Sequence, residues 1–259
     1  MFVEERQARI IERLRERGKV TVEELTETFG VSAPTVRADL AVLETRRLLR
    51  RTHGGALPLE TSLYEPPFAE REAAHSGEKR RIGRAAAAHI RPGETVILDA
   101  GTTTHEIARA LADAGTPRVT VVTNNLPSAV LLMDSAPHVT VIVIGGQTQP
   151  RRRATLGALA VRFLEPLQAD RVFLGVSGVD AGAGLTAVDF DAVQVKQAMI
   201  AHAGEIIVVA DSGKIGVAAF AQIAPLAACH RLITDAGLSD EDAATLGDVG
   251  VGRIERVSL

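Results

Sequence analysis

A turn of small and hydroxyl-bearing residues, Asp99-Ala100-Gly101-Thr102-Thr103-Thr104, follows a short apolar run. An amphipathic stretch comes after it, so we expect a helix to begin within the turn. Amide groups at a helix start favour an anion, three hydroxyls add donors, and Gly101 allows close backbone approach. The pattern favours a phosphate site; a threonine cap that only closes a strand–helix turn is the alternative.

Four further polar turns follow apolar runs along the chain. They centre on Thr123-Asn124, Gly145-Gly146, Gly175 to Gly178 with Asp180, and Asp211-Ser212-Gly213-Lys214. Each is a weak signal alone, because Asn and Gly are common in any turn. Together they predict one ligand site, to which they contribute Thr123, Asn124, Gly146, Gly178, Asp211 and Lys214. Lys214 has two possible roles, neutralising a phosphate or pairing with Asp211.

These turns need a scaffold that brings them to one edge. Apolar runs occur at 95–98, 119–122, 139–144, 172–176, 206–210 and 232–234, and helical patterns such as 104–112 and 192–203 separate most of them. Near-continuous apolar strands alternating with helices predict an α/β fold with a mainly parallel sheet covered on both faces. Ligands of such sheets bind at the carboxyl ends of the strands. The arginines at 151–153 are expected in a solvated loop, with a contact to the ligand as the alternative.

The first part of the chain has a different pattern. Apolar positions at helical spacing occur in residues 3–17, 22–29 and 36–43, and Gly30 separates the last two stretches. Thr21 with Glu24 forms a capping-box pattern, and Ser32 is placed to cap the next helix. Two short helices joined by a turn containing Gly are typical of a helix-turn-helix. A helical packing module with a solvated basic face would show the same periodicity.

After these helices, Gly54-Gly55 between two short extended segments predicts a hairpin, which behind a recognition helix would be a wing. The second helix would present Ser32, Thr35 and Arg37 to the major groove, together with Ala38. Three basic residues of the wing, Arg50, Arg51 and His53, are expected along phosphates or at the minor groove. We predict a DNA-binding domain over 1–58, a Pro-containing connector over 59–75 and an α/β effector domain over 76–259.

Composition excludes several classes of protein. The formal balance is +2 over residues 1–58 and −5 over the rest, too small an excess to indicate nucleic acid by itself. Cys229 is the one cysteine, which excludes a disulfide framework and is expected to be a buried apolar residue. The seven His lack metal-ligand spacing, so we expect no metal and no cofactor. The charged opening and the lack of a long apolar run predict a cytoplasmic protein without a membrane span.

Known enzyme motifs are incomplete in this sequence. Residues 182–187 give only part of a dinucleotide fingerprint and lack its strand–turn–helix context. Residues 212–214 lack the spacing of a phosphate-binding P-loop, and residues 175–178 lack the second glycine spacing of a nucleophile elbow.

Both parts of the chain resemble the deoxyribose-operon-repressor (DeoR) family of bacterial regulators. VTVEELTETFGVSAPTVRADLAVLE with LLRRTHGGAL is similar to the family's winged helix, and GEKRRIGRAAAAHI, DAGTTT, VVTNN, GVSGVD, VKQAMI and ADSGKIG are similar to its sensor domain. Ala38 stands where a second Arg is usual, Arg47 where Gly is usual and Gly213 where Ser is frequent. The first of these departures argues against transferring an operator sequence from relatives.

The resemblance implies a sensor fold similar to ribose-5-phosphate isomerase and the coenzyme-A transferases, and a phosphorylated sugar or related metabolite as effector. It also adds Lys196 to the effector residues. The isomerases carry a Glu directly before this Lys, where this chain has Val195, and a further Lys in a Gly-rich loop that has no counterpart here. Compared with the isomerases, this chain has the predicted phosphate-binding turn and Lys214, but it lacks their proton-transferring base and their second cation. Asp189 or Asp191 could serve as a substitute base.

We therefore expect a transcription regulator, a repressor of sugar or nucleoside catabolic genes, whose hold on a double-stranded operator is modulated by a phosphorylated sugar. Paired half-sites imply a homodimer or homotetramer. The alternative is an isomerase-like or transferase-like enzyme that carries an accessory DNA-binding head.

Overall fold

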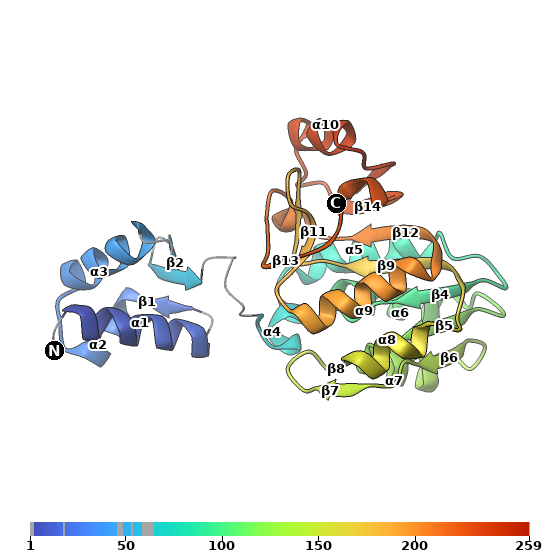
Figure 1. Ribbon diagram of the computed structural model, residues 1–259, viewed down its shortest axis with the longest axis horizontal. Helices are drawn as coiled ribbons and strands as arrows, with labels where there is room; N and C mark the ends of the chain where they lie inside the picture. Colours follow the sequence, from blue (N-terminus) through green and yellow to red (C-terminus); the bar gives the residue numbers. More distant parts are fainter. Residues whose placement is uncertain (1–2, 18, 46–48, 53, 59–64, 259) are drawn as a thin grey trace. The chain divides into compact units, whose positions relative to one another are not determined.

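The computed structural model describes the chain except residues 1–2, 18, 46–48, 53, 59–64 and 259. Two compact units make up the protein, Met1–Pro66 and Pro67–Leu259. We refer to them as the head and the sensor unit (Figure 1). None of the described helices combines the length and the apolar character that crossing a membrane requires.

The head is a small helical domain with a three-stranded sheet of order β1-β3-β2. Its described elements are α1 Val3–Arg17, β1 Val20–Thr21, α2 Val22–Phe29, α3 Ala33–Thr45, β2 Leu49–Thr52 and β3 Gly55–Pro58. The β2–β3 hairpin forms the predicted wing, and β1 joins it by pairing Thr21 with Gly55. A side chain could not replace Gly55, since a Cβ there would lie 1.9 Å from the Val20 carbonyl oxygen.

Local sequence signals set the helix ends of the head. Thr21 caps α2 by accepting a hydrogen bond from the Glu24 amide at 3.1 Å. Gly30 ends that helix in the left-handed conformation with φ 62°, which glycine adopts without steric cost. Ser32 accepts from the Thr35 amide at the start of α3, as predicted. One apolar cluster from all three helices and the wing fills the core, including Ile10, Leu25, Val36, Leu40, Leu43 and Leu49.

The sensor unit alternates strands and helices. Its elements are α4 Phe68–Ala73, α5 Ser76–Ala87, β4 Thr95–Leu98, α6 Thr102–Ala114, β5 Thr120–Thr123, α7 Leu126–Ser135, β6 Thr140–Val143, β7 Gln147–Gln149, β8 Ala154–Leu156, α8 Ala158–Leu164, β9 Ala169–Gly175, β10 Gly178–Asp180, β11 Gly184–Ala187, α9 Phe190–Ala201, β12 Ala203–Val209, η1 Ser212–Lys214, β13 Ala221–Ala224, η2 Leu226–Ala228, β14 Arg231–Asp235, α10 Asp240–Asp248 and β15 Ile254–Val257.

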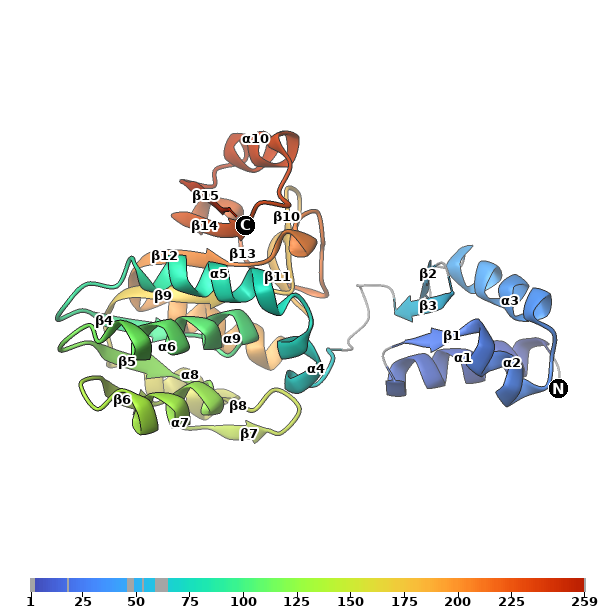
Figure 2. The same ribbon diagram turned by 180° about the vertical axis from the view of Figure 1, so that it is seen from behind.

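A seven-stranded parallel sheet of order β15-β14-β12-β9-β4-β5-β6 forms the centre of this unit. Helices α5, α6 and α7 cover one face, and α8 and α9 cover the other (Figures 1 and 2). Successive residues of one strand enter opposite cores: Val172 and Leu174 face α8 and α9, whereas Phe173 faces α5 and α6. Burial on both sides explains the near-continuous apolar runs, and it confirms the predicted α/β fold.

Several elements depart from the sequence expectation. A seventh strand, β15, joins the sheet although two charged residues, Glu255 and Arg256, stand at its centre. Residues 178–224 contribute an antiparallel sheet of order β10-β11-β13, and β7 and β8 form a separate hairpin. The segment 59–75, expected to be an extended connector, contains the short helix α4. These short or edge elements are stabilised by tertiary contacts more than by their own periodicity.

The carboxyl edge of the sheet gathers the polar turns. Asp99 and Asn124 follow the adjacent strands β4 and β5, Asp211 follows β12 on the far side of β9, and α6 begins directly after the first of these turns. Both views show α4 and the β7–β8 hairpin at one end of the sheet (Figures 1 and 2). Because Thr155 of that hairpin donates its amide to the Asn124 carbonyl at 3.1 Å, this end is the carboxyl edge.

Candidate DNA-binding surface and effector site

Helix α3 presents a polar face and an apolar face. Arg37 and Ala38, four and five residues after the helix start at Ala33, are exposed on the outer face. Ser32 and Thr35 lie at that start, and their hydroxyl oxygens are 2.8 Å apart. The two hydroxyls are therefore hydrogen-bonded to each other at the N-terminal end of α3. In helix-turn-helix proteins this end of the second helix enters the major groove of DNA.

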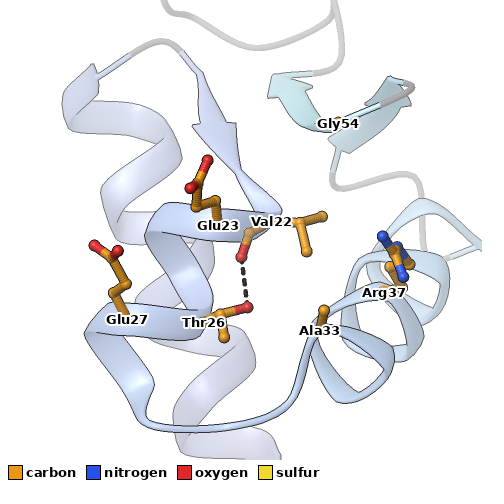
Figure 3. A pocket seen from close by; sticks show the side chains of 7 residues that line it. All are labelled: Val22, Glu23, Thr26, Glu27, Ala33, Arg37 and Gly54. Carbon is orange, nitrogen blue, oxygen red and sulfur yellow. Dashed lines mark hydrogen bonds between the residues drawn. The ribbon is translucent and has the colours of Figure 1, made fainter.

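Arg37 lies in an open hollow between α2, α3 and the wing turn (Figure 3). The hollow is lined by Val22, Glu23, Thr26, Glu27, Ala33, Arg37 and Gly54. The Val22 amide donates to the Gly54 carbonyl at 2.8 Å, so the wing turn is held against the start of α2. Two carboxylates on the α2 side disfavour phosphate there and leave Arg37 as the cation of the hollow.

The wing side chains are described only in part. Arg51 is exposed, its amide donates to the Glu44 carboxylate at 2.8 Å, and its guanidinium lies 4.0 Å from the same group. For Arg50 the structure describes only the backbone, paired opposite Leu57, and His53 lies outside the described residues. The pairing of β2 with β3 confirms the hairpin that was predicted around Gly54-Gly55.

Asp39 points into the head and not toward solvent. Its side chain accepts hydrogen bonds from Arg6 Nε at 2.5 Å, Arg6 Nη2 at 3.2 Å and Gln7 Nε2 at 3.2 Å. Arg6 and Asp39 are both buried. Their hydrogen bond raises the pKa of Arg6, although burial acts in the opposite direction. The Asp39 charge is thus neutralised inside the domain, where it ties α3 to α1.

In the sensor unit, Asp99 and Lys196 form a buried ion pair at the end of β4. Lys196 Nζ donates to Asp99 Oδ2 and to the Gly175 carbonyl, the latter at 2.9 Å. The Gly175 amide donates to the same Asp99 oxygen at 3.0 Å. The pair therefore joins β4, β9 and α9 beneath the site, and its two charges cancel.

The three threonines occupy the first turn of α6 and are all buried. Thr104 Oγ1 donates to the Asp99 carbonyl at 2.5 Å and lies 3.0 Å from the Gly101 carbonyl, which makes it structural. Among the described residues the hydroxyls of Thr102 and Thr103 have no hydrogen-bond partner. The first amides of a helix also lack an internal acceptor. This turn therefore offers several donors to an anion without a cationic side chain.

Thr123 and Asn124 are fully buried at the end of β5. Thr123 Oγ1 donates to the Leu98 carbonyl at 2.6 Å and accepts from the Asn125 amide at 3.0 Å, so its hydroxyl is used within the turn. Asn124 Nδ2 donates to the Thr155 carbonyl at 3.1 Å, whereas its Oδ1 is buried without a partner. Asn124 is the better placed of the two for a polar role.

The candidate glycines have packing reasons of their own. A Cβ at Gly178 would lie 2.1 Å from the Val217 carbonyl oxygen, and one at Gly146 would lie 2.7 Å from the Leu156 carbonyl oxygen. At Gly101 the backbone is extended, and a Cβ would meet Thr104 Oγ1 at 3.2 Å. Close packing therefore accounts for glycine at 146 and 178 without a ligand.

Hydrogen bonds to Asp235, the last residue of β14, hold the turn that follows β12. Asp235 accepts from the Ser212 amide at 2.7 Å, the Ser212 hydroxyl at 2.9 Å and the Gly237 amide at 2.8 Å. Burial raises the pKa of Asp235, but these hydrogen bonds outweigh it and lower the pKa below its ordinary value. Asp211 is buried, and neither its carboxylate nor the Lys214 ammonium has a hydrogen-bond or ion-pair partner among the described residues. They do not pair with each other, which leaves both available.

Sequence reasoning missed Lys79, in the first turn of α5. Its side chain is buried, and its ammonium interacts electrostatically with Asp211, Lys214 and Glu106. The expectation that the Gly-rich loop lacks the isomerases' second lysine stays a prediction; Lys79 is a different cation, and burial lowers the pKa of its ammonium. Lys79 belongs to the stretch GEKRRIG, and the resemblance of this stretch to the family could have indicated a functional role for it. The spacing of apolar residues around Lys79 gives no such indication.

The arginine run at 151–153 is not simply a solvated loop. The Arg151 carbonyl accepts from the Phe68 amide at 2.8 Å, and the Arg153 guanidinium lies 5.4 Å from the centre of the Phe68 ring. Arg152 lies 3.3 Å from Asp189, the residue that caps α9. The tip of the β7–β8 hairpin thus connects α4 with the start of α9.

Comparison with known proteins assigns the chain to a family. Residues 6–62 match the DeoR-like helix-turn-helix domain, and residues 74–236 match the DeoR C terminal sensor domain. The chain belongs to the DeoR family. Together with the exposed face of α3, this membership makes the protein a DNA-binding transcription regulator.

Relatives of this DeoR-family member match it over most of its length. It is 36% identical to the uncharacterised HTH-type transcriptional regulator YulB of Bacillus subtilis, over 96% of this chain and 95% of that protein. It is 33% identical to the HTH-type transcriptional regulator GlpR of Haloferax volcanii, over all of both chains. It is 35% identical to the glycerol-3-phosphate regulon repressor of Escherichia coli, over 88% of each.

Among solved structures, ribose 5-phosphate isomerase A of Methanocaldococcus jannaschii matches with a TM-score of 0.40 and 16% identity, over 55% of each chain.

Proposed function

We propose that this regulator is a repressor of sugar or nucleoside catabolic genes, and that a phosphorylated sugar or related phosphate metabolite bound in the sensor unit changes its hold on the operator. The start of α6 carries this proposal: the hydroxyls of Thr102 and Thr103, two largely buried residues, and the first helix amides have no partner among the described residues. The named functions of relatives support it, since one of them is the repressor of a glycerol-3-phosphate regulon. A chromosomal operator places the work of the protein in the cytoplasm.

The effector residues divide into supports and contacts. Asp99 with Lys196, and Thr123, are occupied by hydrogen bonds that join neighbouring strands, so we assign them to holding the turns in place. Thr102 and Thr103 remain for the phosphate. Asn124, Asp211 and Lys214 remain for the polar end of the ligand, with Gly101 allowing its approach, while Gly146 and Gly178 shape the surrounding backbone.

A receptor fits the site better than an isomerase. Val195, at the position before Lys196 where a base is expected, is a fully buried apolar side chain. Asp189 caps α9 through the Ala192 amide at 3.1 Å and pairs with Arg152, while Asp191 is exposed. The carboxylate of Asp189 is thus engaged by the helix cap and Arg152, and that of Asp191 lies in solvent. Among the described acids of the carboxyl-edge turns, Asp211 is buried and unpaired, so it is the remaining candidate for a catalytic base. Turnover of ribose 5-phosphate by purified protein would show that the protein is an enzyme.

On the DNA side, we propose that Arg37 contacts base edges from the exposed face of α3, with Ser32 and Thr35 at its start. Arg51, with Arg50 and His53 of the wing, would contact phosphates. A wing contact of this kind strengthens binding to any sequence, whereas a base contact discriminates between sequences.

A homodimer follows from paired half-sites, and the sensor unit offers a surface for it. Edge strand β6 carries no charged residue, whereas the opposite edge strand β15 carries Glu255 and Arg256. Exposed apolar side chains cluster on β6 and on the helices α7 and α8 beside it, namely Val130, Met133, Val143, Leu159 and Phe163. An uncharged edge with apolar flanks is a natural site for pairing with a second copy.

The effector site is tested by replacing Thr103 with Glu, using Thr103→Gln as the neutral control of the same size. A carboxylate about 4 Å from the phosphate costs roughly 4 kcal/mol per charge pair near a protein surface, equivalent to nearly a thousandfold loss of affinity. The helix start itself tolerates the carboxylate. Thr103→Glu should bind operator normally and ignore sugar phosphates, as measured by fluorescence anisotropy with labelled DNA. A wild-type response in this variant would move the phosphate site elsewhere.

A further inference from the structure

Lys79 holds the end of α4. Its Nζ donates to the Arg71 carbonyl and to the Ala74 carbonyl, the latter at 2.6 Å. Ala74 is the residue that ends α4, and the last carbonyls of a helix lack partners within the helix. Lys79 therefore satisfies the carboxyl end of the first helix that follows the undescribed residues 59–64.

The same ammonium lies beside the effector turns. Helix α5 packs along α6, with Gly83 directly against Glu106 of that helix (Figure 2). Lys79 is one helical turn before Gly83, and it contacts the end of α4, the helix whose Phe68 ring meets His105 in the first turn of α6. On its other side, Lys79 interacts electrostatically with Asp211 and Lys214 at the end of β12. Lys79 thus lies between two turns of the proposed effector site.

One donor of Lys79 is unused. An ammonium has three N–H donors, and two of them serve the carbonyls of α4. Among the described residues, the third has no acceptor. Lys79 is only 6% exposed, so this donor is a buried polar group for which a ligand oxygen is the matching partner.

Helix α4 also touches α6 immediately after the threonines. The ring of Phe68, which is buried, meets the edge of the His105 ring with centres 5.9 Å apart. His105 Nδ1 is in turn 3.0 Å from the Ser128 hydroxyl on α7. The position of α4 is therefore defined by Lys79 at one end and by the first turn of α6 at the other.

We propose that Lys79 gives its third N–H to an anionic oxygen of the effector while it holds α4, so that occupancy of the site sets how firmly α4 is held. This inference rests on the proposed function, and it adds to it a ligand residue and the first structural step away from the site. The ligand class is a phosphorylated metabolite, because a dianion fits two ammonium groups, Lys79 and Lys214, beside a helix start.

Lys79→Met tests the proposal, because Met keeps the length and apolar stem of the side chain and removes the charge. Arg84→Met is the matched control: Arg84 lies on the exposed side of the same helix and loses the same charge. The probes are inorganic phosphate, glycerol 3-phosphate and ribose 5-phosphate, titrated calorimetrically into the full chain. Hydrogen exchange of residues 67–75, with and without each compound, reports on α4.

In the wild type and in Arg84→Met, the compound that binds should slow exchange over residues 67–75. In Lys79→Met its affinity should fall at least roughly tenfold, the cost of a lost charged hydrogen bond, and exchange over 67–75 should not respond to it. Lys79→Arg, which retains the charge, should keep more of the affinity and serves if Lys79→Met does not fold.

Wild-type affinity together with a wild-type exchange response in Lys79→Met would overturn the role of Lys79 and leave the proposed effector class intact. If the wild-type protein binds none of the three compounds, the phosphate effector fails, and this inference fails with it. Loss of affinity in Thr103→Glu but not in Lys79→Met would confine the phosphate to α6.

Discussion

Replacing Asp39 with Ala should abolish operator binding although Asp39 cannot touch DNA. Its carboxylate is 4% exposed and accepts three hydrogen bonds from α1, two of them from Arg6. Removing it leaves a guanidinium that is 6% exposed without its counterion. Breaking a buried pair in this way costs about 3–5 kcal/mol, and we expect about 3 kcal/mol because the head is small and water lies near.

That cost is large relative to the stability of the head. A unit of this size is stabilised by about 3–10 kcal/mol, and a loss of about 3 kcal/mol lowers its melting temperature by roughly 12 °C or more. Calorimetry of the full chain should show the head transition moving down while the sensor transition stays in place. Fluorescence anisotropy with labelled operator should show binding lost at 37 °C and partly regained on cooling.

The double variant Arg6→Met with Asp39→Leu is the control, because it removes both charges and refills the space with apolar atoms. It should recover most of the lost stability, since a buried ion pair is often replaceable by apolar side chains at little cost. An Asp39→Ala head that melts within about 3 °C of the wild type and binds operator fully would refute the reasoning, since it would show that the pair contributes under about 1 kcal/mol.

Three further outcomes are expected. Arg37→Ala should weaken binding to operator much more than binding to random DNA, whereas Arg51→Ala should weaken both alike and reduce the salt slope of binding by about one, as read by anisotropy over a salt series. Met133→Glu should convert the dimer into a 27.4 kDa monomer in sedimentation, while Phe220→Glu, equally exposed elsewhere, should not. Burial lowers the pKa of His105 below its ordinary value, and the charge of Arg109 lowers it further. As pH falls below about 7, the unfolded chain therefore binds more protons than the folded protein does, and the free energy of unfolding decreases. Urea unfolding at pH 7.5 and 5.5 should show a smaller loss in His105→Gln.

Helix ends in the head and the strands of the sensor unit could be predicted from the sequence because their signals are local. Gly30 ends α2 in the left-handed conformation, and Ser32 caps α3, through residues no more than four apart. Strands buried on both faces leave an apolar run in the sequence, which placed β4 at 95–98 and located β5, β6, β9, β12 and β14 to within a few residues. A parallel sheet then dictates that the turns after its strands share an edge.

The roles of individual polar residues could not be predicted, because they depend on partners far away in the chain. Asp39 finds Arg6 across 33 residues, and Asp99 finds Lys196 across 97. Nothing in the sequence indicated that Asp39 is buried, and the turn position of Asp99 made it a predicted ligand residue. Packing decided that the first neutralises a buried guanidinium and that the second supports the floor of the site.

The sequence by itself therefore determined the helices of the head, most strands of the parallel sheet and the polar turn that starts α6, since periodicity and turn chemistry are properties of neighbouring residues. Tertiary structure alone decided which donors remain free at that turn. The hydroxyls of Thr104 and Thr123 donate to carbonyls of adjacent segments, whereas those of Thr102 and Thr103 have no hydrogen-bond partner among the described residues. It also brought Lys79 of α5 close enough to Asp211, after β12, for the two groups to interact electrostatically. A hydrogen bond requires its two atoms within about 3 Å, and only the packed chain sets distances between segments on that scale.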